Sequence, residues 1–172
     1  MAILDIVTYP DPRLREISKK VGDDREGLAQ LLRDMSDSMF AHNGAGLAAI
    51  QIGVAKSVFI VEAEAAGRDP KDPPLVFIDA EIIWLSDETQ DGDEGCLSFP
   101  GVFVPVRRAL RCRTRATNLE GETFEIEGER LFARAMQHET DHLSGRLLID
   151  NVGRLKRRMI ERRLAREAAA AD

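Results

Sequence analysis

The pentapeptide His-Glu-Thr-Asp-His at residues 138–142 says more about the fold and chemistry of this 172-residue chain than any other stretch. Two histidines four residues apart lie on one face of a helix, close enough for both imidazoles to bind one ion, and Glu139 then lies beside that ion as a base. A packed helix holds such a pair more rigidly than a mobile loop would. Four apolar residues are expected to hold this helix against the sheets: Leu131, Phe132, Ala135 and Leu143.

A metal ion needs more than two protein ligands, and the third ligand separates the enzyme families that share this helix. Many proteases with His-Glu-x-x-His use a downstream glutamate or histidine, but Gly-Arg-Leu-Leu stands at residues 145–148. Cys96 offers a thiolate, which is a strong ligand for borderline-soft divalent metals. We therefore assign Cys96, His138 and His142 as ligands. Three protein ligands leave one position open for water, as catalytic sites do.

Three sequence blocks occur in a characteristic order: Gly-Ala-Gly-Leu-Ala-Ala-Ile-Gln at residues 44–51, Glu-Gly-Cys-Leu-Ser at residues 94–98, and Gln-His-Glu-Thr-Asp-His-Leu-Ser-Gly at residues 137–145. Together they resemble the bacterial peptide deformylases. The Tyr-Pro-Asp-Pro-Arg-Leu-Arg stretch at residues 9–15 resembles the opening of that family, so the likeness runs from about residue 3 to about residue 152. It implies that the chain is a hydrolase that removes the formyl group from the N-terminal formylmethionine of newly made polypeptides.

The residues fit this chemistry. A divalent metal polarises the formyl oxygen and lowers the pKa of its bound water towards about 7, and that metal-bound water is the expected nucleophile. Glu139 is the expected general acid and base. The resemblance implies that the developing oxyanion is held by the metal, by the backbone N–H of Leu97 and by the Gln51 side chain. It also implies a substrate pocket formed by Gly44, Ala45, Gly46, Arg134 and Ala135.

Arg134 lies one helical turn before His138, where many relatives have an apolar residue facing the methionine pocket. Two arrangements are open at this point: its stem lines the pocket while its guanidinium reaches solvent, or the pocket is larger or less selective than in those relatives. Two imidazoles and a thiolate accept Zn²⁺, Fe²⁺, Co²⁺ or Ni²⁺. The resemblance favours Fe²⁺ as the working metal.

Three other functions can be weighed against deformylation. A metallopeptidase that cuts internal peptide bonds is disfavoured by the missing downstream ligand, and a non-catalytic metal-binding or ribosome-associated protein by the presence of Glu139 and Gln51. The pattern Gly44-x-Gly46-x-x-Ala49 also matches a dinucleotide-binding fingerprint, which needs a strand before the glycines and a helix after them. Here the order is reversed, because a helical pattern precedes the glycines and a strand pattern follows them.

The composition, with 44% hydrophobic and 31% charged residues, is typical of one globular domain. The apolar patterns predict an α+β fold, in which antiparallel sheets pack around the central metal-binding helix and a helix lies at each end of the chain. Residues 1–150 would form a single catalytic deformylase-like domain. The first seven residues lack the features of a signal peptide, so we expect a cytoplasmic monomer that does not contact membranes.

Individual elements follow from periodicity. We expect a helix over residues 28–40 with Asp23 or Asp24 as its N-cap, and strands at residues 57–61, 75–78 and 82–85. Residues 110–117 and 122–127 should form a hairpin. The alternation of arginines around Cys112 places that thiol on the buried face of its strand.

Residues 151–172 form a basic C-terminal helix or tail. They hold seven basic and three acidic residues, a charge of +4, which leaves about −10 for the rest of a chain whose net charge is −6. Leu155, Met159 and Leu164 suggest the apolar side of a helix. A solvated terminal helix is one interpretation; a transient ribosome contact near the nascent-chain exit, as the resemblance implies, is the other.

Overall fold

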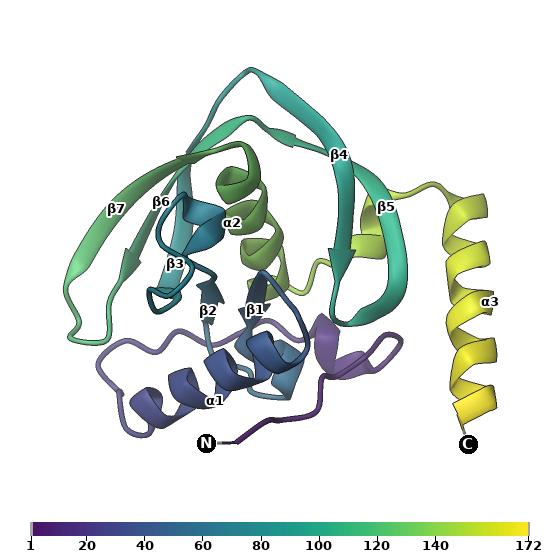
Figure 1. Cartoon of the computed structure of the whole chain (residues 1–172), viewed down its shortest axis with the longest axis horizontal. Coiled ribbons are helices and arrows are strands. Elements are labelled where there is room, and N and C mark those ends of the chain that lie inside the picture. The colour runs from purple at the N-terminus through teal and green to yellow at the C-terminus, as the bar shows by residue number, and fades with distance from the viewer. Residues whose placement is uncertain (1, 172) are drawn as a thin grey trace.

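The computed structural model describes residues 2–171, which form two separate layers of antiparallel strands around a helix (Figure 1). The α-helices are α1 (Leu28–Ala41), α2 (Arg130–Leu143) and α3 (Arg154–Ala171). The strands are β1 (Gly46–Ala48), β2 (Val58–Val61), β3 (Leu75–Leu85), β4 (Thr89–Cys96), β5 (Phe99–Ala109), β6 (Arg111–Thr117) and β7 (Thr123–Glu129). Short 3-10 helices are η1 (Pro12–Arg15), η2 (Ala49–Ile52), η3 (Glu64–Ala66) and η4 (Leu148–Asn151).

One sheet has the strand order β1-β2-β3-β6-β7 with antiparallel neighbours throughout, and β4 and β5 form the other as a two-stranded hairpin. Figure 1 shows α2 between the two layers, with α1 across one end and α3 outside β5. Phe132, Ala133 and Met136 of α2 belong to the same buried cluster as Phe59 and Phe77 of the sheet. The expected α+β fold with a central helix and a helix near each end is therefore confirmed.

Helix α1 spans the predicted residues, but the prediction of its N-cap is wrong. Gly27 is the N-cap, with a φ of 71° and no capping side chain, whereas Asp23 and Asp24 lie before it. The left-handed backbone conformation costs little energy at a glycine, because glycine has no Cβ. This turn of the chain lets Leu28, the first residue of the helix, pack in the core.

Strand β3 joins the two strands predicted at residues 75–78 and 82–85. Its pairing with β6 shifts register between Ile78 and Glu81, and Asp79 between them has a φ of 52°. The Asp79 carboxylate accepts hydrogen bonds from the backbone N–H groups of Val21 (2.7 Å) and Gly22 (2.9 Å). The predicted break is thus a bulge that ties the strand to the segment before α1.

The hairpin predicted at residues 110–127 is present as β6 and β7. Cys112 is buried, as expected, and burial raises the pKa of its thiol to about 11. Arg113 and Arg115 lie on the other face, where each faces a glutamate of β7 within salt-bridge distance. This alternation confirms that the arginines cover a solvated strand surface.

Helix α2 packs through a different set of residues from the one expected. Phe132 and Leu143 are buried as predicted and Ala135 is half-buried, but Leu131 is 57% exposed. Ala133 and Met136 are buried in its place. The reason is that α2 has β-structure on two sides, so the Leu131 side faces a cavity between the layers.

The apolar side predicted for α3 is partly wrong. Ile160 and Leu164 are buried against Val102 and Val104 of β5, whereas Leu155 and Met159 are 75% and 61% exposed. The Tyr9 hydroxyl donates to Glu161 (2.9 Å) and fixes the rotation of the helix. None of the helices within residues 2–171 combines the length and apolar character needed to cross a membrane.

Candidate metal centre and catalytic cavity

A cavity of about 830 Å³ opens between α2, the β4–β5 hairpin and the segment that follows α1. The structure brings together here all the residues predicted for the site except His142, which is 1% exposed and does not line the cavity. Those lining residues are Gly44, Ala45, Gly46, Gln51, Cys96, Leu97, Arg134, Ala135, His138 and Glu139.

Three residues from two elements could hold a metal ion. Cys96 ends β4, where a register shift after Gly95 turns it out of the regular ladder, and His138 and His142 lie one turn apart on α2. One sulfur and one nitrogen from each ring lie within 4.8 Å of one another, and Cys96 Sγ is 3.5 Å from His142 Nε2. One soft and two borderline ligands at this spacing suit a transition-metal ion.

The two histidines have different electrostatic surroundings. Burial opposes protonation of His138, but hydrogen bonds with Cys96 and Glu94 outweigh it and raise its pKa well above the usual value. Burial, the neighbouring His138 and Arg108 lower the pKa of His142 well below the usual value. Negatively charged groups around His138 therefore favour a positive charge at this position, whereas the surroundings of His142 disfavour one. Metal ligation requires neutral imidazoles, so a bound cation would replace the proton that Cys96 and Glu94 favour on His138.

Glu139 lies in the cavity with an unsatisfied carboxylate. The side chain is 5% exposed, and its buried Oε2 has no hydrogen-bond partner among residues 2–171. Burial raises its pKa to about 7. A carboxylate near neutrality can both accept and donate a proton at physiological pH. Gly46 makes room for it, because a Cβ at residue 46 would lie 2.7 Å from Glu139 Oε1.

Gln51 is held rigidly beside the thiol. It lies in η2, and its Oε1 accepts a hydrogen bond from the backbone N–H of Ala48 (2.9 Å). Its Nε2 group donates to Ser98 Oγ (3.1 Å) and lies 3.4 Å from Cys96 Sγ. The amide nitrogen therefore faces the proposed ligand cluster, in an orientation set by two other contacts.

A buried charge network behind the ligands was not predicted from the sequence. Glu94 accepts two hydrogen bonds from Arg108, at 2.8 and 2.9 Å, and one from His138 Nδ1 at 2.8 Å. Arg108 also bonds Asp141 at 2.7 Å. Burial would raise the pKa of Glu94, but Arg108 and His138 hold it well below its usual range. One feature of the sequence indicates this network. Arg108 follows the valines of β5 at the same alternate spacing, which places it on the buried face of the strand, where an arginine needs an acidic partner.

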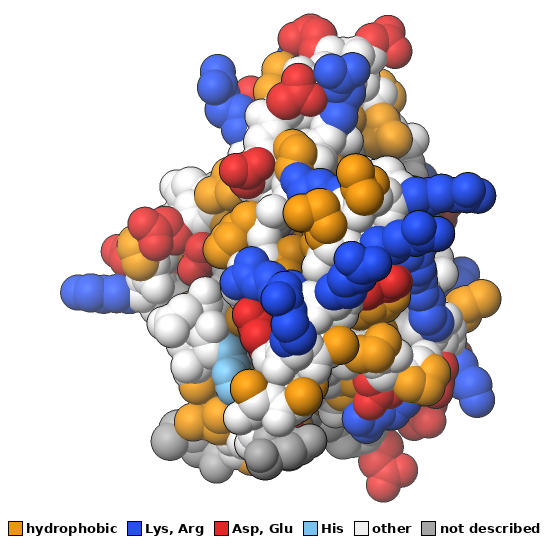
Figure 2. Space-filling model, turned by 90° about the vertical axis from the view of Figure 1, so that its right-hand side faces the viewer, with side chains coloured by type: hydrophobic (Ala, Val, Ile, Leu, Met, Phe, Trp, Pro, Cys, Tyr) orange, Lys and Arg blue, Asp and Glu red, His pale blue; other side chains and the backbone are white. Residues whose placement is uncertain are grey.

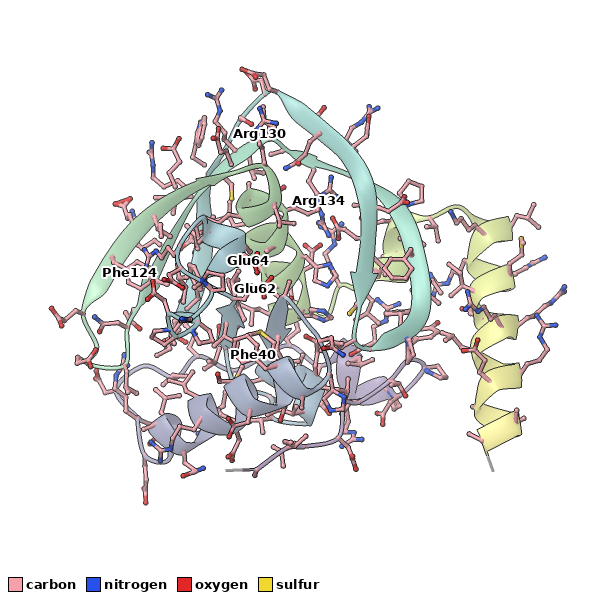
Figure 3. The ribbon with its side chains drawn as sticks, viewed as in Figure 1. Phe40, Glu62, Glu64, Phe124, Arg130 and Arg134 are labelled. Atoms are coloured by element: carbon pink, nitrogen blue, oxygen red, sulfur yellow. The ribbon has the colours of Figure 1, made fainter. Side chains whose placement is uncertain are left out.

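The prediction that the Arg134 guanidinium reaches solvent is wrong. Arg134 is 9% exposed, and its Nη1 donates to Glu94 Oε2 at 2.6 Å and to the Val106 carbonyl at 2.9 Å. Figure 3 shows the side chain between α2 and the β4–β5 hairpin. The buried carboxylate of Glu94 draws both arginines inward, and the half-buried Asp141 gives Arg108 a second partner, because an ion pair compensates the burial of each charge.

Comparison with known proteins gives a consistent result. A family model described as polypeptide deformylase matches residues 3–158. The peptide deformylase of Bartonella tribocorum is 45% identical over 168 residues, which covers 98% of this chain and 94% of that protein. The peptide deformylase of Phenylobacterium zucineum is 42% identical over 171 residues and covers 99% and 100% of the two chains.

Solved structures agree with the sequence comparison. A peptide deformylase from Legionella pneumophila superposes with a TM-score of 0.90 at 39% identity, covering 99% of this chain and 98% of that one. The peptide deformylase from Ehrlichia chaffeensis in complex with actinonin superposes with a TM-score of 0.89 at 32% identity, covering 97% and 98%. The likeness therefore includes α3 as well as the cavity.

Proposed function

The chain belongs to the polypeptide deformylase family, whose members remove the N-formyl group from nascent peptides, and we propose that it acts on N-formylmethionyl chains with a metal ion held by Cys96, His138 and His142. The observation that carries this proposal is the cluster of these three residues at a cavity that Cys96, His138 and Glu139 line, where Glu139 Oε2 has no hydrogen-bond partner among residues 2–171.

The bound metal would supply a Lewis acid that polarises the formyl oxygen and acidifies water. The proposed ligands would accept Fe²⁺, Zn²⁺, Co²⁺ or Ni²⁺. We propose Fe²⁺ as the working metal, on the ground of the family resemblance.

Glu139 is the proposed general acid and base. Its carboxylate would take a proton from the attacking water and deliver it to the amine that leaves when the formyl C–N bond breaks. Burial and a pKa of about 7 support both steps at neutral pH. Gly46 leaves the space that this carboxylate occupies in the cavity.

Gln51 and the backbone N–H of Leu97 are the proposed donors to the developing oxyanion. Gln51 Nε2 lies 3.4 Å from Cys96 Sγ, and Leu97 directly follows that cysteine. Preorganised donors stabilise a transition state without reorganising during the reaction. The bonds that fix Gln51 to Ala48 and Ser98 support such a role.

The formylmethionine itself would lie along the segment Gly44, Ala45 and Gly46, with its side chain towards Arg134 and Ala135. The two glycines allow the substrate backbone to approach closely. Arg134 brings its charge into this wall already paired with Glu94, so the pocket would still accept an apolar side chain.

We further propose that residues 1–150 act as the catalytic domain and that α3 provides a transient ribosome contact. The exposed basic residues on the face of the molecule that carries α3 support a ribosome contact (Figure 2). A nascent-chain substrate would place the reaction in the cytoplasm. We propose a monomer as the working form.

The test is release of formate from a formyl-Met dipeptide by protein purified anaerobically with Fe²⁺, with Glu139→Ala prepared in parallel. Rapid release by the unaltered enzyme alone is the expected result. Absence of formate from folded, metal-loaded protein would refute the proposed substrate, and equal rates from Glu139→Ala would refute the proposed base.

A further inference from the structure

Glu94 accepts four hydrogen bonds, two on each carboxylate oxygen. Oε1 is bonded to Arg108 Nη2 (2.9 Å) and His138 Nδ1 (2.8 Å), and Oε2 to Arg108 Nε (2.8 Å) and Arg134 Nη1 (2.6 Å). An ionised carboxylate only accepts, so the proton on this side of the His138 ring is on Nδ1 and the lone pair is on Nε2. Glu94 thereby sets both the tautomer and the orientation of a proposed ligand.

Arg134 connects this carboxylate with the cavity. Its side chain lines the cavity, while Nη1 bonds Glu94 and the carbonyl oxygen of Val106. Gly92 on β4 provides the space, because a Cβ at residue 92 would lie 3.1 Å from Arg134 Nη2. With Arg108 and Asp141, the cluster contains two positive and two negative side chains.

We infer that Arg134 is a positioning residue for His138: it holds Glu94 against the Nδ1 group and so fixes the direction of the ring's free nitrogen. The inference rests on the proposed function in taking His138 as a metal ligand. Arg108 also bonds both Glu94 oxygens, but it belongs to β5 and so does not tie Glu94 to the helix that carries His138. Arg134, from α2, gives the carboxylate a second anchor on the same helix as His138.

The sign of the change in metal affinity tests this role. Replacement of Arg134 by methionine removes a positive charge near the site, and by electrostatics alone that would tighten binding of a divalent cation. A positioning role predicts the opposite. Loss of an outer partner of a ligand typically weakens metal affinity 10- to 100-fold, and we expect about 10-fold because Arg134 acts through Glu94.

The experiment measures the Zn²⁺ dissociation constant by chelator competition, and the visible absorption spectrum with Co²⁺, for Arg134→Met and for Arg107→Met. Arg107 of β5 is the matched control: like Arg134 it is paired with a carboxylate of β4, but it is exposed and does not line the cavity. We expect weaker Zn²⁺ binding and an altered Co²⁺ spectrum for Arg134→Met only. With formyl-Met and formyl-Ala peptides, kcat should fall by the same factor for both.

Unchanged or tighter Zn²⁺ binding in Arg134→Met would overturn the inference, as would equal weakening in Arg107→Met. A changed preference between the two peptides with normal metal binding would also overturn it, and would make Arg134 a side-chain contact instead. Gly92→Ala tests the same point with every charge retained, since its Cβ must displace the guanidinium. It should alter the Co²⁺ spectrum in the same direction, to a smaller extent. Metal binding does not depend on the substrate, so these results remain informative if deformylation itself is not observed.

Discussion

The Glu139 carboxylate lies so close to Gly46 that residue 46 has no space for a side chain larger than hydrogen. Because a Cβ would approach Oε1 to 2.7 Å, Gly46→Ala must displace that carboxylate. General acid–base catalysis typically contributes about 100- to 10,000-fold, so we expect kcat to fall by about 100-fold or more. Metal content should stay normal, since no proposed ligand moves. Gly153→Ala is the control, because its added methyl meets open space and its φ is not left-handed. Full activity of Gly46→Ala would contradict the proposed place of the base.

The side-chain amide of Gln51 is held by hydrogen bonds with Ala48 and Ser98, and its nitrogen also lies near the Cys96 thiol. Gln51→Leu keeps the approximate volume and removes the donor, so we expect kcat to fall by about 100- to 1000-fold, the usual effect of losing one oxyanion donor. Metal analysis and steady-state kinetics would separate this loss from a loss of metal. Exposed Gln30 offers a comparison on α1, and Gln30→Leu should have normal kinetics. A large rise in KM with unchanged kcat would argue for simple substrate binding.

The site residues differ in how far the sequence could reveal them. His138 and His142 are four apart on one helix, so local geometry predicts their common face. Cys96 and Gln51 were assigned from chemistry and resemblance, because no local rule places residues so distant in sequence. The partners of Glu94 are a matter of tertiary packing: which arginine meets which carboxylate depends on how α2 sits between the layers. The sequence around Arg134 is equally compatible with a guanidinium that reaches solvent and with one that is buried.

Helix α3 shows the same limit for an element. Met159 and Ile160 are both apolar neighbours, and periodicity alone does not decide which one faces the core. In the structure Ile160 packs on β5 and Met159 faces outward. We expect Ile160→Ala to lower the free energy of unfolding by about 2 kcal/mol, at the lower end of large-to-small core substitutions because the site is peripheral. Met159→Ala should change it by less than about 0.5 kcal/mol. Urea unfolding of both variants measures the difference, and equal effects would contradict this rotation of α3.

Asp150 in η4 joins the N-terminal segment to α3. Burial raises its pKa, but hydrogen bonds from Arg15 and from the Leu147 backbone N–H outweigh burial and hold the pKa below its usual value. A carboxylate with a lowered pKa stabilises the fold above its unfolded-state pKa of about 3.9, and this contribution is lost as the pH falls through the folded-state pKa. Asp150→Asn should therefore be less stable than the unaltered enzyme at pH 6 and closer to it at pH 3.

Urea unfolding at the two pH values measures that convergence. Asp72→Asn, in an exposed turn, removes one carboxylate without these contacts and serves as the control. A difference between Asp150→Asn and the unaltered enzyme that stays constant from pH 6 to pH 3 would show that the carboxylate charge is not what stabilises the contact.

At the scale of the whole molecule, fold class follows from alternating and helical periods, but the layer arrangement does not. The hairpin of β6 and β7 was predictable because its strands are adjacent in the chain and share a short turn. The pairing of β3 with β6 skips an entire hairpin, so it depends on β4 and β5 leaving the sheet. The β3 bulge at Asp79 likewise depends on a distant partner, the Val21–Gly22 backbone. Such long-range pairings carry little local signal.

The distribution of charge over the molecule also makes a prediction. Arg154, Arg158, Arg162 and Arg166 recur every four residues along α3, are exposed, and have no salt-bridge partner in the part of the chain that the structure describes. The rest of the chain is acidic, so α3 is the side suited to phosphate groups. If α3 contacts ribosomal RNA, Arg158→Glu with Arg162→Glu should weaken ribosome binding.

Each lost phosphate contact lowers the salt dependence of binding by about one unit of slope, so the double variant should lower it by about two. Lys20→Glu with Lys71→Glu makes the same change in net charge at exposed residues elsewhere and should bind normally. Cosedimentation with ribosomes over a range of salt concentrations measures both variants. Formate release from a dipeptide should be unchanged in each, because α3 packs on β5 and does not line the cavity. Equal weakening by the two double variants would show that net charge, and not this face of α3, determines the contact.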